Sequence, residues 1–159
     1  MTVTIRPGEA QDVQLIADLI RRLARYERLE DQVSMTPERL EHTLFGPRRY
    51  AETLIAEDGG ASAGFALFFH NYSTFLGRPG IYLEDLFVLE SHRGRGIGRA
   101  LLARLAAIAV ERDCGRLEWA VLDWNQDAIG FYERLGARPN SEWTVYRLAG
   151  DALLSLAGK

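Results

Sequence analysis

Three glycines at every second position punctuate the segment Arg93-Gly94-Arg95-Gly96-Ile97-Gly98. A strand-like pattern of β-branched and aromatic residues, 81–88, precedes this loop, and a helical pattern follows it. Glycines let backbone N–H groups converge without interference from Cβ atoms, and a helix start adds the positive end of its dipole. The arginines of the loop, with Arg99, surround the same place with positive charge. The loop is therefore expected to bind a phosphate, in particular a pyrophosphate.

Three known phosphate-binding patterns can be compared with this loop. A P-loop is excluded because no Gly-Lys-Ser/Thr follows at the required spacing. The dinucleotide pattern Gly-x-Gly-x-x-Gly needs a glycine where Arg99 stands. The third pattern, Arg/Gln-x-x-Gly-x-Gly/Ala, is met from Arg93 to Gly98, and the loop thereby resembles the acetyl-coenzyme A loop of the GCN5-related N-acetyltransferases. A plain glycine-rich linker is the remaining alternative, disfavoured by the strand and helix on either side.

Other blocks of the chain extend the resemblance to the diamine N-acetyltransferases, a group that includes the spermidine/spermine and thialysine enzymes. These blocks are Leu23-Ala24-Arg25-Tyr26-Glu27, Gln32-Val33, Gly64-Phe65-Ala66, Tyr82-Leu83-Glu84-Asp85-Leu86-Phe87-Val88, Trp124-Asn125 and Phe131-Tyr132. These blocks lie between residues 23 and 132, and the resemblance covers nearly the whole chain, from about residue 5 to residue 156. The resemblance implies an α/β fold with a mixed, mostly antiparallel central sheet that is splayed after its fourth strand and flanked by helices.

The resemblance also implies the co-substrate and the residues that hold it. Acetyl-CoA would be the acyl donor, and no metal is expected. The implied cofactor-binding residues are Leu86, Phe87, Val88, Arg93, Gly94, Arg95, Gly96, Ile97, Gly98, Arg99, Asn125 and Phe131. Among these, the backbone of 86–88 would grip the thioester carbonyl and the pantetheine arm like an added strand.

Acetyl transfer to an amine needs a base and an acid. A primary aliphatic amine has a pKa of about 10.4 and is almost fully protonated at neutral pH, so a general base must act. Glu84 is the candidate base, with Asp85 beside it, although strict alternation sends the two side chains to opposite faces unless a bulge intervenes. Tyr132 is the candidate general acid toward the departing thiolate. The alternatives are carboxylates that pair with surface arginines, and a core aromatic beside Phe131.

Carboxylates in two segments would determine which amine binds. The predicted substrate-binding residues are Tyr26, Glu27, Glu84 and Asp85. Several carboxylates along one groove attract a polyamine better than an amine with one positive charge. Glu30 and Asp31 extend the acidic stretch, but they fit a solvated turn equally well. The short turn 58–61 replaces a longer insertion of the polyamine enzymes, which leaves the choice of amine open.

The order of predicted elements agrees with the implied fold. Strands are expected at 2–6, 51–57, 62–72, 81–88, 116–121 and 143–148. Helices are expected at 12–27, 36–45, 97–112, 125–135 and 151–157, the second of them capped by Thr36 with Pro37 in its first turn. The glycine loop lies in the one crossover of βαβ type. A single domain, 1–159, is expected.

Composition limits the class of protein. The 159 residues are 47% hydrophobic and 26% charged, as in a globular domain, and no apolar run is long enough to span a membrane. The net charge of −3 argues against nucleic acid as a partner. The single cysteine, Cys114, and an N-terminus without a signal pattern predict a cytoplasmic protein. The family resemblance further suggests a homodimer.

The alternatives to a diamine enzyme are an acetyltransferase for another amino acid or a protein terminus, and a non-catalytic acyl-CoA-binding module.

Overall fold

A computed structural model describes residues 2–159 of the chain. The chain forms two compact units, the first ending at Ala120 and the second running from Val121 to Lys159. The elements of the first unit are β1 (Val3–Pro7), η1 (Ala10–Asp12), α1 (Val13–Tyr26), η2 (Glu30–Gln32), α2 (Pro37–Phe45), β2 (Glu52–Asp58), β3 (Ala61–Ser73), β4 (Arg78–Val88), η3 (Glu90–His92), α3 (Ile97–Glu111) and β5 (Leu117–Trp119). The second unit contains α4 (Gln126–Arg134) and α5 (Gly150–Leu156).

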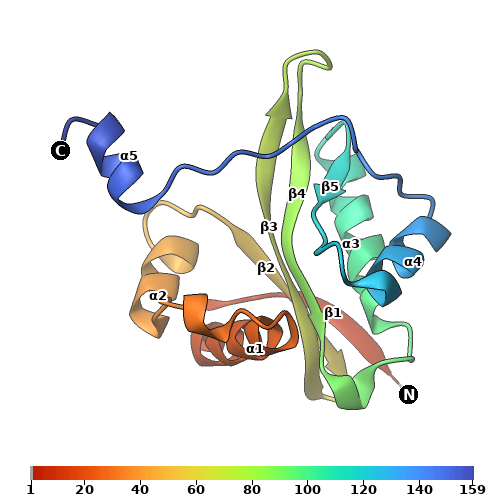
Figure 1. The fold of residues 1–159 in the computed structure, drawn as a ribbon. Coiled ribbons are helices and arrows are strands. Elements are labelled where there is room, and N and C mark those ends of the chain that lie inside the picture. The colour runs from red at the N-terminus through yellow and green to blue at the C-terminus, as the bar shows by residue number, and fades with distance from the viewer. Residues whose placement is uncertain (1) are drawn as a thin grey trace. The chain divides into compact units, whose positions relative to one another are not determined.

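The sheet of the first unit has five strands in sequence order, β1 to β5. The first four are antiparallel to their neighbours, and β5 is parallel to β4. Figure 1 shows β3 and β4 as a long hairpin through the centre of the sheet, and α3 as the crossover that leads from β4 to β5. The sheet is thus mixed and mostly antiparallel, as predicted.

Helices cover both faces of this sheet, with α1 and α2 against one face and α3 against the other (Figure 1). The helix periodicity of α1 and α2 places apolar residues toward the sheet, and their buried cluster is Val13, Ile16, Ala17, Leu19, Leu23, Leu40, Leu44, Ile55, Phe65 and Phe87. On the other face, α3 buries Ile97, Leu101, Leu102, Leu105, Ile108 and Ala109. Each large aliphatic or aromatic side chain buried in this way contributes about 1.5–3 kcal/mol.

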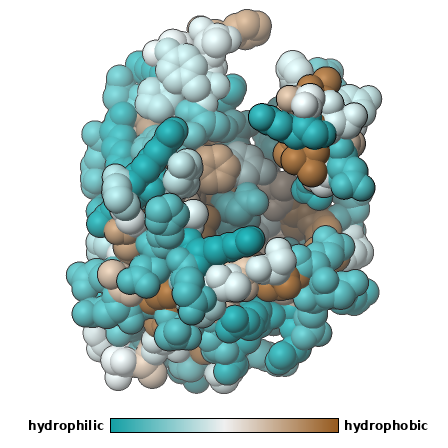
Figure 2. Space-filling view, turned by 90° about the vertical axis from the view of Figure 1, so that its left-hand side faces the viewer, coloured by the Kyte–Doolittle hydropathy of each residue, from teal (hydrophilic) through white to brown (hydrophobic). Residues whose placement is uncertain are grey.

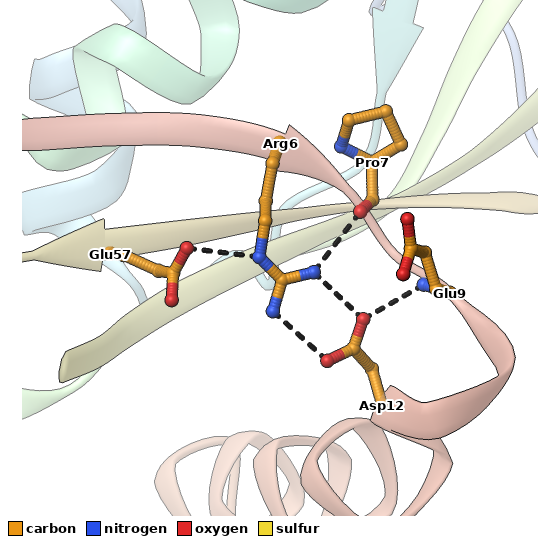
Figure 3. A network of polar contacts seen from close by, with 5 residues as sticks. All are labelled: Arg6, Pro7, Glu9, Asp12 and Glu57. Carbon is orange, nitrogen blue, oxygen red and sulfur yellow. Dashed lines mark hydrogen bonds and ion pairs between the residues drawn. The ribbon is translucent and has the colours of Figure 1, made fainter. Parts of the chain in front are cut away.

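An ionic network fastens the N-terminal strand to the rest of the first unit (Figure 3). The Arg6 guanidinium donates to both carboxylate oxygens of Asp12, at 2.8 Å and 3.0 Å, and to Glu57 at 2.9 Å. Asp12 also accepts from the backbone N–H of Glu9 at 2.8 Å, and it is buried. The hydrogen bond from Arg6 holds the pKa of the Asp12 carboxyl below its usual range. This network joins β1, β2 and η1 ahead of α1.

Most elements lie within a few residues of their predicted bounds. Thr36 caps α2, since its hydroxyl accepts from the Arg39 N–H at 3.2 Å, and Pro37 is the first helical residue. Cys114 is free and lies shortly after the end of α3 at Glu111. Two strand predictions need correction. β5 is only three residues long, and 143–148 forms no strand in the part of the chain that the structure describes. A strand needs a neighbouring edge for its hydrogen bonds, and alternation in sequence cannot supply that edge.

In the second unit, α4 has well-defined ends. The Asn125 side chain accepts from the Ala128 N–H at 3.3 Å and so caps the helix start. The chain turns after the helix at Gly136, whose φ of +92° suits glycine. These two features confirm the helix that the sequence predicted between them.

Candidate active site

A β-bulge lies in β4 at the two predicted carboxylates. In the β3–β4 register Leu67 is opposite Asp85 and Phe68 is opposite Leu83, so Glu84 is an extra residue without a partner. An extra residue breaks the strict alternation of side chains and increases the local twist of the strand. The bulge therefore allows two neighbouring residues of one strand, Glu84 and Asp85, to contribute to the same site.

The sheet opens at this bulge. The parallel pairing of β4 with β5 covers only three residues and ends at Leu83 opposite Trp119. Residues 86–88 remain paired with β3 on their other side, through Leu86 with Ala66, Phe87 with Phe65 and Val88 with Gly64. The edge of 86–88 that faces away from β3 is outside the β5 ladder, so an extended ligand can bind there through backbone hydrogen bonds. The splayed sheet predicted from the family resemblance is thus confirmed.

Three carboxylates interact around the bulge: Glu84 and Asp85 from β4, and Glu27 from the end of α1. Glu84 is exposed, while Glu27 and Asp85 are half-buried. Burial, with repulsion from Glu84 and Glu27, raises the pKa of Asp85 to about 7. The pKa of Glu27 is also raised, first by burial and then by the charge of Glu84. Within residues 2–159, none of the salt bridges involves these three carboxylates.

Other acidic residues near the end of α1 are arranged differently. Glu30, in η2, forms a salt bridge with Arg25 at 3.1 Å, and both side chains are exposed. Asp31 is exposed in the same short helix. These two residues therefore fit the solvated turn, one of the two interpretations that the sequence left open. Figure 2 shows this side of the molecule as mostly hydrophilic, with brown hydrophobic areas scattered among the hydrophilic residues.

The glycine loop has the geometry of an open backbone cradle. Gly94 and Gly96 adopt φ angles of +77° and +79°, which other residues rarely reach, and Gly96 is the N-cap of α3. A Cβ atom at either glycine would meet no other atom within 4 Å. The space beside these glycines is thus open, and the first N–H groups of α3 lack helical partners. Such a cradle fits an anionic phosphate group.

The arginines of this loop differ in their partners. Arg95 pairs with Asp58 at 2.9 Å. The Arg93 side chain is directed toward the end of α1, where its guanidinium lies over the ring of Tyr26. Arg99 is exposed in the first turn of α3. Of the three, Arg93 connects the loop with the predicted amine-binding residues, a contact that nothing in the residue spacing indicated.

The remaining predicted site residues belong to the second unit and lie on or before α4. Phe131 and Tyr132 are adjacent on the helix, with their ring centroids 5.5 Å apart and the planes tilted by 50°. Asn125 is buried and caps the same helix. The helix thus fixes the position of Tyr132 relative to Asn125 and Phe131.

The family model described as "Acetyltransferase (GNAT) family" matches residues 16–137. This match includes the bulge, the glycine loop and α4. The chain belongs to the GNAT family.

Full-length relatives agree with this assignment. The GNAT chain is 38% identical over 169 aligned positions to the thialysine N-epsilon-acetyltransferase of Sus scrofa, with 99% of each chain covered. It is 50% identical over 94 residues to the L-ornithine N5-acetyltransferase NATA1 of Arabidopsis thaliana, a match that covers 59% of this chain and 41% of that protein. The solved structure of the integron cassette protein VCH_CASS6 from V. cholerae is similar with a TM-score of 0.84 and 29% identity, covering 100% and 99% of the two chains. This GNAT protein is an acetyltransferase for an amine.

No helix of this acetyltransferase, within residues 2–159, is long and apolar enough to cross a membrane. Over the same residues, no group of three or more His, Cys, Asp and Glu side chains could hold a metal ion. The predictions of no membrane, nucleic-acid or metal partner remain predictions.

Proposed function

We propose that this acetyltransferase moves an acetyl group from acetyl-CoA to a primary amine of a small di- or polyamine, or of a diamino acid such as thialysine. The observation that carries the proposal is the group of three interacting carboxylates, Glu27, Glu84 and Asp85, at the point where β4 leaves β5. Like charges held close together without a cationic partner cost free energy. A substrate with two ammonium groups would remove that cost on binding.

The names of two relatives support a substrate with more than one amine. Thialysine and ornithine, which appear in those names, are diamino acids. A second positive charge can remain in contact with one carboxylate while the other amine loses its proton and reacts. A protein terminus or a simple amino acid would offer one ammonium group to three carboxylates and would leave most of the repulsion in place.

The residues present fit acetyl-CoA, which supplies an activated thioester when it binds. The open cradle at Gly94 and Gly96, with the N-terminus of α3, suits its pyrophosphate. The edge of 86–88 that lies outside the β5 ladder suits the amide-containing arm that leads to the thioester, except at the Val88 carbonyl oxygen, which accepts from Arg93. Arg95, Ile97, Gly98 and Arg99 complete the loop, and Asn125 and Phe131 would contribute from the second unit.

Two residues would move protons in the proposed reaction. Glu84 accepts a proton from the incoming ammonium group, directly or through water, so that a neutral amine attacks the carbonyl. Asp85 is a second candidate for this base, because burial brings its pKa to about 7, near the pH at which a base works best. The Tyr132 hydroxyl donates a proton to the departing thiolate, and backbone N–H groups of 86–88 stabilise the negative charge on the oxygen.

A substrate panel tests the proposal. Purified protein would be incubated with acetyl-CoA and, in turn, spermidine, a simple diamine, ornithine, thialysine, glycine and a lysine-containing peptide, and thiol release would be followed. We expect the highest kcat/KM for amines that carry two positive charges. Equal kcat/KM for the diamines and for glycine would contradict the carboxylate argument. If no amine in the panel led to thiol release, the proposed function itself would be wrong.

The role of Tyr132 has its own test. Tyr132→Phe removes the proton donor but keeps the ring beside Phe131. General acid catalysis contributes about 10²- to 10⁴-fold, so kcat should fall by that order. The KM for acetyl-CoA and the thermal midpoint should change little. A kcat within about twofold of wild type would assign the ring to packing alone.

Three coarser properties complete the proposal. We infer one acetyltransferase domain from 1 to 159, because the family match at 16–137 continues across the boundary between the two units.

A homodimer is supported by the strand-like but unpaired stretch 143–148, which exposes Trp143, Val145 and Tyr146. Sedimentation at micromolar concentration distinguishes a dimer from a monomer. A cytoplasmic location is supported by one free cysteine, Cys114.

A further inference from the structure

Arg93 stands between two parts of the proposed site. It follows η3 and precedes Gly94, the first glycine of the loop. Its backbone N–H donates to Glu90 at 3.3 Å, so the main chain at this residue is already held by the turn before the loop. Its long side chain leaves the loop and reaches other elements of the first unit.

Three contacts hold that side chain in one place. The Nε–H donates to the carbonyl oxygen of Val88 at 3.0 Å. The guanidinium carbon lies 4.8 Å from the ring centroid of Tyr26 and 5.5 Å from that of Phe87. Both distances are within the range of cation–π attraction, about 6 Å. The two rings are themselves 6.3 Å apart and tilted by 49°, so the cation touches an aromatic pair.

The aromatic pair joins a fixed element to an exposed one. Phe87 is buried in the core between the sheet and α1, and only 7% of it is exposed. Tyr26 is the last residue of α1 and is 37% exposed, so packing alone restrains it less. Glu27, the next residue, is the C-cap of that helix and one of the three carboxylates of the site. A force that holds the Tyr26 ring against Phe87 therefore also fixes where Glu27 lies.

We propose that Arg93 is a positioning residue that couples the cofactor loop to the amine site: its backbone belongs to the loop, while its side chain clamps Tyr26, and with it Glu27, against β4. This inference rests on the proposed function of the loop and of the carboxylates. The Arg93 side chain then acts on amine binding rather than on the pyrophosphate. Arginine suits the role because its planar group can lie on a ring while its Nε–H remains bonded to Val88.

The test compares two arginines of the same loop. Arg93→Gln and Arg95→Gln each remove one positive charge, but Arg95 pairs with Asp58, whereas Arg93 contacts Tyr26. Arg93→Lys restores the charge without the planar group. For each variant the KM for the preferred amine, the KM for acetyl-CoA and the thermal midpoint are measured. Calorimetry gives the amine affinity directly.

For Arg93→Gln we expect the amine KM to rise about three- to thirtyfold, the equivalent of lost cation–π contacts, with the KM for acetyl-CoA changed less than twofold. Arg93→Lys should restore part of the loss. Arg95→Gln should raise the KM for acetyl-CoA more than that for the amine. In a Tyr26→Leu background, Arg93→Gln should add almost nothing to the amine KM, because the ring through which Arg93 positions Glu27 is already absent.

Two results would overturn the inference. One is an Arg93→Gln variant whose KM rises for acetyl-CoA but not for the amine, which would make the side chain a pyrophosphate ligand. The other is an equal change in both constants with a lower thermal midpoint, which would make Arg93 a general stabiliser of the fold. If the wild-type protein acetylates none of the amines, the proposed function fails and the inference fails with it. Because that result concerns the wild type alone, it is distinguishable from the other two.

Discussion

The network of Arg6, Asp12 and Glu57 and the cluster of Glu27, Glu84 and Asp85 use the same chemical group in opposite ways. In the network, each carboxylate accepts hydrogen bonds from one guanidinium, and the pKa of Asp12 is lowered (Figure 3). In the cluster, the carboxylates repel one another and form no salt bridge among the described residues, and the pKa values of Glu27 and Asp85 are raised, first by burial and then by this repulsion.

The difference indicates which carboxylates serve the fold and which serve a ligand. A paired carboxylate is already satisfied, so its charge stabilises the folded chain and has little left to offer a substrate. Crowded carboxylates lower the stability of the folded protein while no cation is bound. Binding of a cationic ligand relieves their repulsion, and this relief contributes to the binding free energy. Removing a carboxylate should therefore have opposite effects on stability in the two regions, and only the cluster should affect catalysis.

The largest effect is expected for Glu84→Gln. The amide keeps the size of the side chain but cannot act as a base, so kcat should fall about 10²- to 10⁴-fold. The thermal midpoint should stay or rise slightly, because a repulsive charge beside Asp85 is gone. Steady-state kinetics and thermal unfolding on the same preparation check both parts. A kcat near that of wild type would show that Glu84 is not the general base and would favour Asp85 in that role.

A smaller effect, on stability alone, is expected for Asp12→Asn. The substitution removes the buried negative charge that pairs with the partly exposed Arg6. Hydrogen bonds to charged groups contribute about 1.5–3 kcal/mol, so the free energy of unfolding should fall by about that amount at pH 7, with kcat and both KM values unchanged. Because the folded pKa of Asp12 is lowered, its stabilisation is present above about pH 4 and is lost as the pH falls further. Urea unfolding at pH 7 and pH 3 should show the difference between wild type and variant shrinking.

Asp18→Asn is the matched control for this variant. Asp18 pairs with Arg22 at 3.0 Å on the exposed side of α1, with 57% and 53% of the two side chains exposed. An exposed pair of this kind contributes about 0.3–0.5 kcal/mol. If Asp12→Asn and Asp18→Asn lowered the free energy of unfolding equally, the burial of Asp12 would add nothing to stability. The contrast between paired and crowded carboxylates would then be wrong for the paired group.

The effect expected for Asp85→Asn is on stability, and its sign is reversed. The folded pKa of about 7 lies above the value of about 3.9 in an unfolded chain, so the charged form is disfavoured in the folded protein. Above pH 7 that cost is fully present, and it disappears as the pH falls toward 4. Asp85→Asn should therefore raise the free energy of unfolding at pH 8, by about 1.4 kcal/mol for each unit by which the folded pKa exceeds the unfolded one, and by almost nothing at pH 4.

Urea unfolding at the two pH values measures this change, and a saturating diamine gives a further control. The diamine should stabilise the wild-type protein more than Asp85→Asn, because only the wild type has the full repulsion to relieve. A variant that is less stable than wild type at pH 8 would show that Asp85 is satisfied in the folded protein, and the comparison would fail.

Local signals in the sequence were sufficient for most elements of the fold. Pro37 after Thr36 marks the start of α2, and the open loop expected from the glycine spacing is present, with Gly94 and Gly96 in the positive-φ region that glycine permits. The splay of the sheet came from family resemblance rather than from periodicity. Alternation in 143–148 led to a wrong strand, because pairing depends on a partner that the segment itself does not encode.

By itself, the sequence identified the residues of the proposed site: the loop glycines and arginines, the adjacent Glu84 and Asp85, and Tyr132 in a predicted helix. These follow from short-range spacing, which backbone geometry converts directly into local structure. Only the tertiary structure decided that the bulge falls at Glu84, that Asp85 and Glu27 share its repulsion, and that Arg93 reaches Tyr26. Burial, repulsion and ring contacts are interactions between segments far apart in the chain, and they exist only once the sheet and α1 have packed together.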